Sequence, residues 1–285
     1  MAADTVGQID IRGENIDRAV KGFALQTYKF KSICLVQSSN NWTETYYKET
    51  AADLSAAGSR SVEHISRLSK FPYGEVSWEK TSVQLRKYGM EGVVSWEDQK
   101  TNQIDVVTRE TLRIGRAIAK AVDDAIYSAI TNDSTIQTGA AVATWDATTA
   151  SSRDPIRDIL TGIQKIEEQH YDVSSAVMLL SPHDYTSLMM NSKVINNPSF
   201  KTADVVSNGK VGQIAGLTII KSTSVPADEA LVIKGQKAAT WKSVQDLTTE
   251  VIYDKLVRYR IRAVEVGVTQ IRNPRAIVRL TGMDA

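Results

Sequence analysis

The longest regular pattern of apolar and polar positions in the chain predicts a helix from about residue 104 to residue 131. Apolar or small side chains recur at alternating steps of four and three residues, which is the spacing of one helix face. This stripe consists of Val107, Thr111, Ile114, Ile118, Ala121 and Ala125. The opposite face carries Arg109, Arg113, Arg116 and Lys120. At a rise of 1.5 Å per residue such a helix is about 40 Å long, well above the usual length.

A second pattern is the tetrapeptide Val-Ser-Trp-Glu, which occurs at 76–79 and again at 94–97. Its alternation of apolar and polar residues predicts a half-buried strand at each copy. Pro72 and Gly74 predict a hairpin tip, a shift in apolar phase predicts a bulge at 80–82, and Gly89 with Gly92 predicts a second bend. We therefore expect a long, bent, two-stranded projection, which buries too little surface to be stable without outside support.

Residues 1–58 precede this projection and show no sustained period, so we expect an extended arm with short ordered pieces. The arm has too few aliphatic residues for a core of its own, yet it carries Trp42, Tyr46 and Tyr47. Aromatic residues in such a segment indicate that it lies on another surface, in the same subunit or in a neighbour. A mobile terminus is the alternative.

The rest of the chain alternates between short helices and strands. Helical periodicity predicts a helix at 155–170 and another after Ser181, while apolar runs predict strands at 174–180, 230–233 and 238–242. Residues 248–280 mostly alternate, and Asn273-Pro274 separates off a last strand at 276–280. A long helix, a long hairpin and a mixed layer of helices and strands together indicate an α+β fold.

Composition and charge exclude several classes of protein. The 285 residues are 42% hydrophobic, enough for one elaborate domain or two modest ones. A net charge of +1 leaves no global field that would attract nucleic acid or lipid, so any such binding must be local. Cys34 is the single cysteine and cannot form an internal disulfide. We find neither a secretion signal nor an apolar run of the roughly 20 residues that a membrane span needs, and we expect cytoplasmic synthesis.

The residues that could carry catalysis are dispersed. The three histidines are far apart in the sequence, at His64, His170 and His183. This spacing does not suit a metal site. Ser181, His183 and Asp184 are neighbours at a predicted helix start, where they cannot adopt the geometry of a hydrolytic triad, so Ser181 is interpreted as a helix N-cap. No glycine-rich phosphate loop is present. We therefore expect no catalytic residue, no metal and no cofactor.

Two strips of cations stay open to more than one interpretation. The basic face of helix 104–131 could meet phosphates or the carboxylates of a neighbour, or it could be an ordinary solvent-exposed face. The same choice applies to Arg258, Arg260 and Arg262, which alternate with less polar residues. The residue pattern does not separate these interpretations.

The order of several motifs along the chain is more specific than any one of them. Arg-Lys-Tyr-Gly at 86–89 precedes the second Val-Ser-Trp-Glu, and the long helix carries Asp-Asp-Ala-Ile at 123–126. Ile-Ala-Gly-Leu-Thr-Ile at 214–219 precedes Val225-Pro226, and Asn-Pro-Arg-Ala-Ile-Val at 273–278 closes the series. From about residue 40 onward, this order resembles the major capsid proteins of tailed bacteriophages.

The resemblance implies the shell fold named for coliphage HK ninety-seven, which encapsulins share. Its parts would be an N-terminal arm at 1–58, an extended loop at 59–92, a peripheral domain with the spine helix at 93–149, an axial domain at 150–245 and C-terminal peripheral strands at 246–285. The implied function is assembly rather than catalysis. Pentamers and hexamers would form the icosahedral shell around double-stranded DNA, in a virion capsid assembled in the host cytoplasm.

The resemblance also implies contacts between subunits. The extended loop would contribute Arg67, Lys70, Phe71, Tyr73 and Trp78. The arm would contribute Trp42, Tyr46 and Tyr47. Some relatives crosslink a loop lysine to a neighbour's asparagine with help from a glutamate. Lys70 and Asn273 are suitable residue types, but no helper can be identified, so we favour a shell without this crosslink.

Partners and alternatives follow from the same comparison. Because only about sixty residues precede the loop, we expect a separate scaffolding protein, together with a portal protein, optional decoration proteins and DNA packaged without sequence specificity. No membrane partner is expected. The main alternative is an encapsulin-like compartment that packages enzymes. More remote alternatives are a hydrolase that uses Ser181 and a nucleotide-binding protein that uses the arginine strips.

Overall fold

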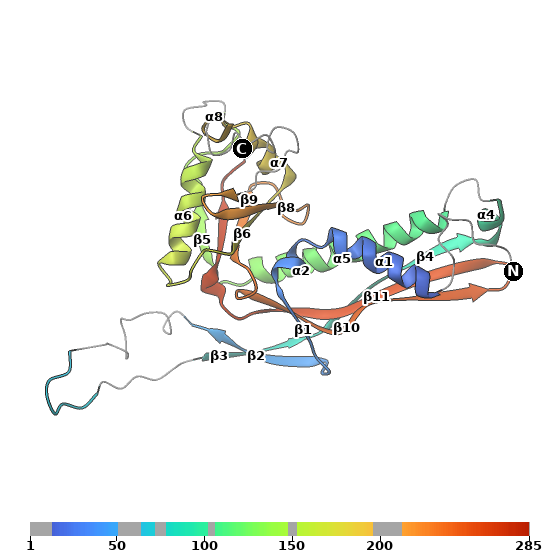
Figure 1. The fold of residues 1–285 in the computed structure, drawn as a ribbon, viewed down its shortest axis with the longest axis horizontal. Coiled ribbons are helices and arrows are strands. Elements are labelled where there is room, and N and C mark those ends of the chain that lie inside the picture. Colours follow the sequence, from blue (N-terminus) through green and yellow to red (C-terminus); the bar gives the residue numbers. More distant parts are fainter. Residues whose placement is uncertain are drawn as a thin grey trace.

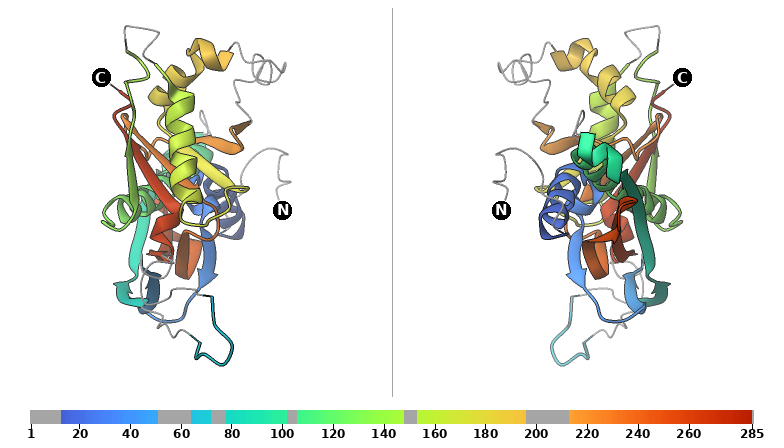
Figure 2. Two further views of the ribbon diagram at one scale, coloured as in Figure 1. Left: turned by 90° about the vertical axis from the view of Figure 1, so that its left-hand side faces the viewer. Right: turned by 90° about the vertical axis from the view of Figure 1, so that its right-hand side faces the viewer.

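A computed structural model describes residues 13–50, 64–71, 78–101, 106–147, 153–195 and 213–284. The chain forms an elongated lobe, a compact lobe and a thin hairpin that projects away from both (Figure 1). In both side views the compact lobe stands above the elongated lobe (Figure 2). One cluster of buried apolar residues lies within the compact lobe, and the other joins the elongated lobe to Leu179, Leu231 and Ile277 of the compact lobe.

The elongated lobe is built on a four-stranded sheet in the order β1-β10-β11-β4. Its strands are β1 (Leu35–Ser38), β4 (Arg86–Ser95), β10 (Ala239–Asp254) and β11 (Arg258–Ile271). β1 pairs parallel with β10, and the other two pairings are antiparallel. The helices of this lobe are α1 (Gly13–Thr27), α2 (Phe30–Ile33), α4 (Trp96–Thr101) and α5 (Val106–Thr131).

The compact lobe is built on a six-stranded sheet in the order β5-β12-β9-β6-β8-β7. Its strands are β5 (Gln137–Ala140), β6 (Ala176–Leu180), β7 (Gln213–Ile214), β8 (Leu217–Lys221), β9 (Glu229–Lys234) and β12 (Ile277–Thr281). Its helices are α6 (Pro155–Glu167), α7 (Pro182–Met189), α8 (Ser192–Ile195) and the 3-10 helix η2 (Pro274–Ala276).

The long helix α5 has the position and amphipathic character that the sequence predicts. Val107, Thr111, Ile114 and Ile118 are buried, and the helix ends at Thr131 as expected. Ala121 is the exception, because it is exposed while the next residue, Val122, is buried. The buried stripe is thus rotated slightly from the predicted one along the C-terminal half of the helix.

The arm is not extended over its first described part, which corrects the prediction for residues 13–27. That segment is helix α1, and it buries Ile16, Val20 and Ala24 completely. α1 packs closely on α5, since a Cβ added at Gly115 would lie 3.1 Å from the backbone oxygen of Val20. The spacing of four residues between the buried side chains was the signal that could have identified this helix.

The projecting hairpin pairs β2 (Thr43–Glu49) with β3 (Trp78–Gln84) in antiparallel register. Its outgoing strand therefore lies in the predicted arm, not in the predicted loop at 59–92. The register is continuous across 80–82, so the expected bulge is absent there. The break falls at Leu85 instead, whose N–H donates to the oxygen of Trp42 as the chain passes from β3 to β4.

The predicted bend at Gly89 and Gly92 is also wrong, because β4 pairs with β11 without a register shift from Arg86 to Ser95. The glycines permit close packing instead. A Cβ at Gly92 would lie 2.9 Å from Cδ1 of Ile114 on α5, and one at Gly89 would lie 3.0 Å from the oxygen of Ala263.

The two copies of Val-Ser-Trp-Glu have different structures. The first copy reaches β3, which begins at Trp78, and its residues 76 and 77 lie outside the described residues. The second copy is divided, because Val94 and Ser95 end β4 whereas Trp96 and Glu97 begin α4. The prediction of a strand is therefore wrong for the second half of this copy.

The sheets cross the predicted domain limits at two strands. β5 and β12 belong to the six-stranded sheet, although the limits drawn from the resemblance placed both in the peripheral domain. β5 pairs with β12, and β12 pairs with β9, so both strands complete the compact lobe. The remaining limits stay predictions.

Candidate interaction surfaces

The described residues 64–71 lie beyond the β2 and β3 strands, away from both lobes (Figure 1). Arg67 and Lys70 are exposed, Leu68 is 100% exposed and Phe71 is 83% exposed. Apolar side chains exposed to this extent on a thin projection are unfavourable in water, and their free energy falls when another surface covers them. Tyr73 and the side chain of Trp78, which the sequence also assigns to this contact, lie outside the described residues.

The three aromatic residues of the predicted arm differ in exposure. Trp42 and Tyr47 are 61% and 59% exposed, so both are available to a neighbour. Tyr46 is buried, and its hydroxyl hydrogen-bonds to the backbone of Ile271. Burial is the largest cause of a raised pKa of the Tyr46 phenol. Tyr46 therefore packs within its own chain, and its contact with a neighbour stays a prediction.

The root of the hairpin is fixed to the body by polar contacts. Lys48 forms a 2.6 Å ion pair with Asp133, and both side chains are at most 10% exposed. The hydroxyl of Tyr171 donates to the carboxylate of Glu49, and the N–H of Glu49 donates to the oxygen of Arg272. These contacts join β2 to the end of α5, to the compact lobe and to the end of β11. No local sequence pattern predicts these contacts, since the partners are far apart along the chain.

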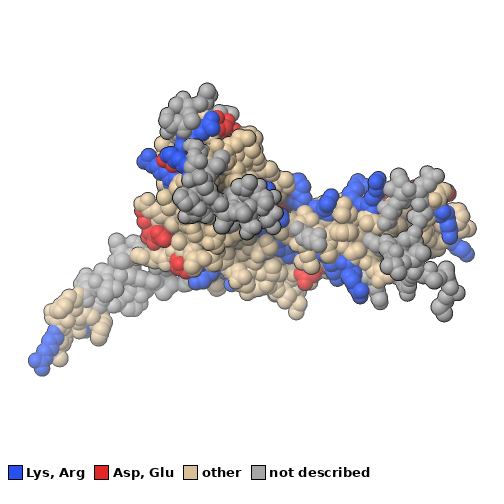
Figure 3. Space-filling model, turned by 45° about the horizontal axis from the view of Figure 1, so that its top comes forward, with Lys and Arg blue, Asp and Glu red and all other residues tan. Residues whose placement is uncertain are grey.

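All four cations of the predicted basic face of α5 are exposed. Arg113 pairs with Glu110 at 3.2 Å, and Lys120 pairs with Asp124 at 2.8 Å. Within the described part of the chain, Arg109 and Arg116 have no ion-pair partner. Figure 3 shows basic side chains spread along the elongated lobe, with few acidic ones on the same face. Among the described residues, α5 therefore offers two cations without an ion-pair partner to an anionic partner.

The arginines of β11 are paired instead. Arg258 and Arg260 contact Asp254, and Arg262 contacts Glu91 at 2.8 Å. The two acids hold these cations on the strand, which disfavours the interpretation of this strip as a nucleotide or phosphate site. The hydrogen bond from Arg258, together with contacts from Arg260, holds the pKa of Asp254 below its ordinary value.

The turn between β10 and β11 is an exposed apolar surface that the sequence analysis missed. Tyr253, Leu256 and Val257 are 49%, 61% and 59% exposed, and the ring of Tyr253 stacks on Tyr259. The Leu-Val pair directly after Asp254-Lys255 was the available signal, because turns usually carry polar residues.

Ser181 has the capping role that the sequence predicts. Its hydroxyl accepts from the N–H of Asp184 and also donates to the carboxylate of Asp184 at 2.8 Å. The serine therefore contacts the acid directly, so the histidine does not lie between nucleophile and carboxylate as a triad requires. Burial raises the pKa of Asp184.

His183, Asp184 and Asp284 place their possible ligand atoms within 4.8 Å of one another. His183 is 3.4 Å from Asp284 and 3.8 Å from Asp184. The helix cap already accounts for Asp184, so this cluster does not itself indicate a metal site. In the described part of the chain, no helix is long and apolar enough to cross a bilayer.

Comparison with known proteins gives a consistent result. A family model described as "Phage capsid protein" matches residues 78–280. No curated protein matches the chain. Among solved structures, a virus-like particle from Pyrococcus furiosus has a TM-score of 0.67 at 12% identity, over 95% of this chain and 100% of that chain.

Two further structures have the same architecture. The capsid of the cyanophage P-SCSP1u has a TM-score of 0.65 at 15% identity, over 90% of this chain and 89% of that chain. The capsid of a native GTA particle has a TM-score of 0.61 at 13% identity, over 100% of this chain and 96% of that chain. At such identities the likeness establishes the fold, and the α+β shell fold expected from the sequence is confirmed.

Proposed function

The chain belongs to the phage capsid protein family and has a capsid shell role, and on this premise we propose that its copies form the pentamers and hexamers of an icosahedral shell. The shell encloses the double-stranded DNA genome of a tailed phage. Head-to-tail contacts of one surface with a different surface on the next copy close into rings, which is the symmetry that such capsomers need.

The projecting hairpin is the observation that carries this proposal. β2 and β3 extend away from the body, and Leu68 and Phe71 beyond them are almost fully exposed. A ribbon of two strands is at best marginally stable in water when nothing covers it. A neighbouring subunit supplies the missing surface in a ring, so assembly accounts for a feature that a solitary protein would not retain.

The exposed turn between β10 and β11 supports a second kind of contact. It lies at the opposite end of the elongated lobe from the hairpin (Figure 1), so the two surfaces can bind different neighbours. Many weak interfaces of this kind hold each subunit more firmly than one of them alone. We assign the hairpin to contacts within a ring and the turn to contacts between rings.

The further partners are part of the same proposal. A separate scaffolding protein guides assembly in the host cytoplasm, a portal protein occupies one vertex, and decoration proteins are optional. DNA is held without sequence specificity, with the free cations of α5 as its contacts.

Lys70 is exposed, but we expect no covalent link to Asn273. A single monomer band from assembled shells on a denaturing gel is the expected result.

Electron microscopy of the expressed protein tests the proposal. We expect the unchanged chain to form closed shells of uniform size with pentamers and hexamers. The double variant Leu68→Asp with Phe71→Asp places charges at the hairpin and should give soluble, unassembled subunits. The matched control is Leu25→Asp with Met190→Asp, which changes two other exposed apolar residues elsewhere. Soluble monomers from the unchanged chain at high concentration, with no rings or shells, would refute the proposal.

The same particles separate the alternatives. Shells that contain a cargo enzyme and no DNA would replace the phage assignment by an encapsulin-like compartment. Turnover by monomeric material that is lost on changing Ser181→Ala would replace assembly by hydrolysis. The nucleotide-binding alternative would require stoichiometric nucleotide in purified monomer.

A further inference from the structure

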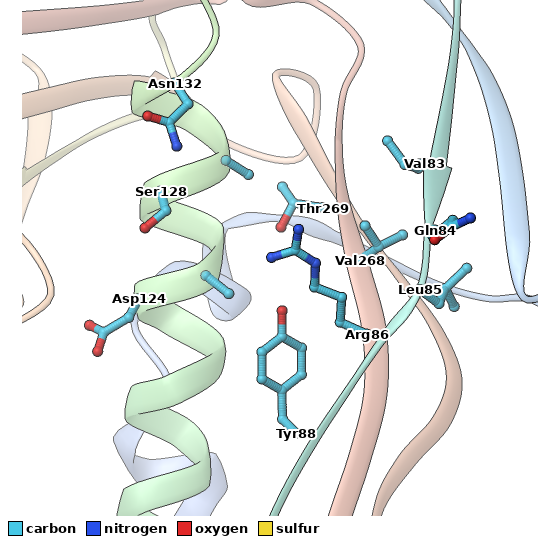
Figure 4. A pocket seen from close by; sticks show the side chains of 12 residues that line it. Val83, Gln84, Leu85, Arg86, Tyr88, Asp124, Ser128, Asn132, Val268 and Thr269 are labelled. Carbon is cyan, nitrogen blue, oxygen red and sulfur yellow. The ribbon is translucent and has the colours of Figure 1, made fainter.

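A groove of about 710 Å³ opens between the C-terminal half of α5 and the segment where β3 becomes β4. Ala125 and Ala129 contribute to its helical wall, and Val83 and Leu85 contribute to the opposite wall. Arg86 extends from β4 into the space between the two walls (Figure 4). Its side chain is exposed, and it has no ion-pair partner among the described residues. The groove therefore holds a cation that a ligand can reach from outside.

With one exception, the polar side chains that line the groove can donate a hydrogen bond. The hydroxyl of Tyr88 points toward the guanidinium of Arg86, and the hydroxyl of Thr269 lies beside it (Figure 4). Ser128 and Asn132 add a hydroxyl and an amide on the helical wall. Burial raises the pKa of the Tyr88 phenol, and the nearby Arg86 guanidinium opposes this rise. The phenol is therefore neutral near pH 7 and keeps its proton for donation.

The exception is Asp124, an acid whose charge is already neutralised. Its carboxylate pairs with Lys120 at 2.8 Å, and in Figure 4 it points away from Arg86. Among the described residues, the lining of the groove therefore offers one free cation, several donors and no free acid. Such a set of groups favours an anion, and the planar guanidinium suits the paired oxygens of a phosphate or a carboxylate.

The position of the groove beside the basic face of α5 favours a chain of phosphates. Lys120 is the last cation of that face, and its ion pair with Asp124 places it at the edge of the groove. Arg109 and Arg116 lie farther toward the start of the same helix, with Arg116 about 12 Å from Asp124 along the axis. A duplex carries one charge per roughly 1.7 Å of its axis, so it presents phosphates at both places. A single carboxylate would contact Arg86 alone.

We propose that the groove binds a phosphate of the DNA backbone, while Arg109 and Arg116 contact other phosphates of the same duplex. The bound phosphate accepts hydrogen bonds from the guanidinium of Arg86 and from the hydroxyls of Tyr88 and Thr269. Because such contacts reach the backbone alone, they fix the duplex without reading its sequence. This inference rests on the proposed function and adds a contact on β4 to the free cations of α5.

Two neighbouring residues of β4 provide a matched test. Arg86 and Lys87 are both exposed, but they lie on opposite faces of the sheet because successive strand residues alternate. Arg86→Gln should make the slope of log affinity against log salt concentration shallower by about 0.9, the value for one lost phosphate contact. Lys87→Gln removes the same charge from the other face and should change the slope by less than about half of that. Fluorescence anisotropy with duplex DNA and the full chain measures both slopes.

A second pair of variants blocks the groove without changing any charge. Ala129→Leu places a larger side chain in the groove, whereas Ala121→Leu places it on an exposed part of α5 outside the groove lining. We expect Ala129→Leu to weaken DNA binding several-fold and to reduce the salt slope as Arg86→Gln does. Ala121→Leu should bind DNA as the unchanged chain does. Circular dichroism checks that all four variants are folded.

The outcomes separate this inference from the proposed function. Normal shells together with equal salt slopes for Arg86→Gln and Lys87→Gln overturn the inference and leave the proposed function intact. Unweakened binding by Ala129→Leu also overturns it. A loss specific to Arg86→Gln in subunits that never form shells supports the groove contact and counts against the shell.

Titration calorimetry with inorganic phosphate distinguishes the two sources of the anion. We expect no saturable binding of free phosphate, because the groove supplies only one cation and the other contacts come from the duplex. Saturable phosphate binding that Arg86→Gln abolishes, together with an unchanged salt slope for DNA, would assign the groove to free phosphate and overturn its assignment to DNA.

Discussion

Lys48, at the root of the projecting hairpin, forms a 2.6 Å ion pair with Asp133, the acid that follows the C-terminus of α5. Both side chains are almost fully withdrawn from water, and Asp133 also accepts hydrogen bonds from the backbone and hydroxyl of Thr135. The pair therefore sets the direction in which the hairpin leaves the body.

Removing one partner of this pair should be costly. Lys48→Met leaves the carboxylate of Asp133 buried without its cation, so we expect the free energy of unfolding to fall by about 3 to 5 kcal/mol. Lys120→Met is the matched control, because its pair with Asp124 is exposed and should contribute less than about 1 kcal/mol. Urea unfolding of the unassembled subunit measures both. Equal losses in the two variants would show that the hairpin root is not fixed by this contact.

The same pair predicts a dependence of stability on pH. Burial raises the pKa of Asp133, but hydrogen bonds from Lys48 and Thr135 outweigh it and hold the pKa below its ordinary value. A carboxyl group whose folded pKa is depressed stabilises the fold above its unfolded pKa of about 3.9, and this contribution is lost as the pH falls through the folded value.

The comparison that isolates this effect is with the double variant Lys48→Met, Asp133→Asn, since both chains share every other carboxylate. We expect the difference in unfolding free energy between the two chains to be constant near neutral pH and to shrink below about pH 4. A difference that is independent of pH down to acid unfolding would contradict the depressed pKa.

The packing of α1 on α5 predicts opposite effects for two glycines. A Cβ at Gly22 would have no atom within 4 Å, so Gly22→Ala should stabilise the subunit by about 1 kcal/mol through helix propensity. A Cβ at Gly115 would lie 3.2 Å from Cβ of Phe23, so Gly115→Ala should destabilise it by about 1 to 3 kcal/mol through overpacking. Thermal unfolding distinguishes the two signs. A stabilising Gly115→Ala would mean that α1 does not lie against α5 in solution.

These elements also show how far the sequence predicts the structure. α5 was predictable because Val107, Ile114 and Ile118 repeat over many turns. α1 was missed because its stripe is short, although Ile16, Val20 and Ala24 have helical spacing. Periodicity is a weak signal in a short segment, and tertiary packing decides its structure.

Strand partners were harder to predict than strands. The outgoing strand of the hairpin is β2, whose partner β3 follows after a long separation in sequence, and local alternation carries no information about that pairing. Gly89 and Gly92 predict bends from the sequence because a glycine that permits close packing looks the same in sequence as one that permits a turn. The ion pair of Arg262 with Glu91 could not be predicted either, because β11 and β4 are far apart in the sequence and pair only in the fold.

The free cations of α5 predict a specific effect on DNA binding. Each phosphate contact releases counterions, so the slope of log affinity against log salt concentration is about −0.9 per contact. Arg109→Gln with Arg116→Gln removes two cations that have no ion-pair partner in the described residues. Binding of duplex DNA by assembled rings should then weaken at low salt, and its salt slope should become shallower by nearly two units.

Arg258→Gln with Arg262→Gln provides the matched control, since it removes the same net charge from another exposed surface. Asp254 and Glu91 already neutralise these arginines, so their removal should change the slope by less than one unit. A slope that changes equally in both double variants would show that DNA responds to the net charge of the subunit rather than to the exposed face of α5. Fluorescence anisotropy over a salt series measures all three proteins under identical conditions, and circular dichroism checks that both variants remain folded.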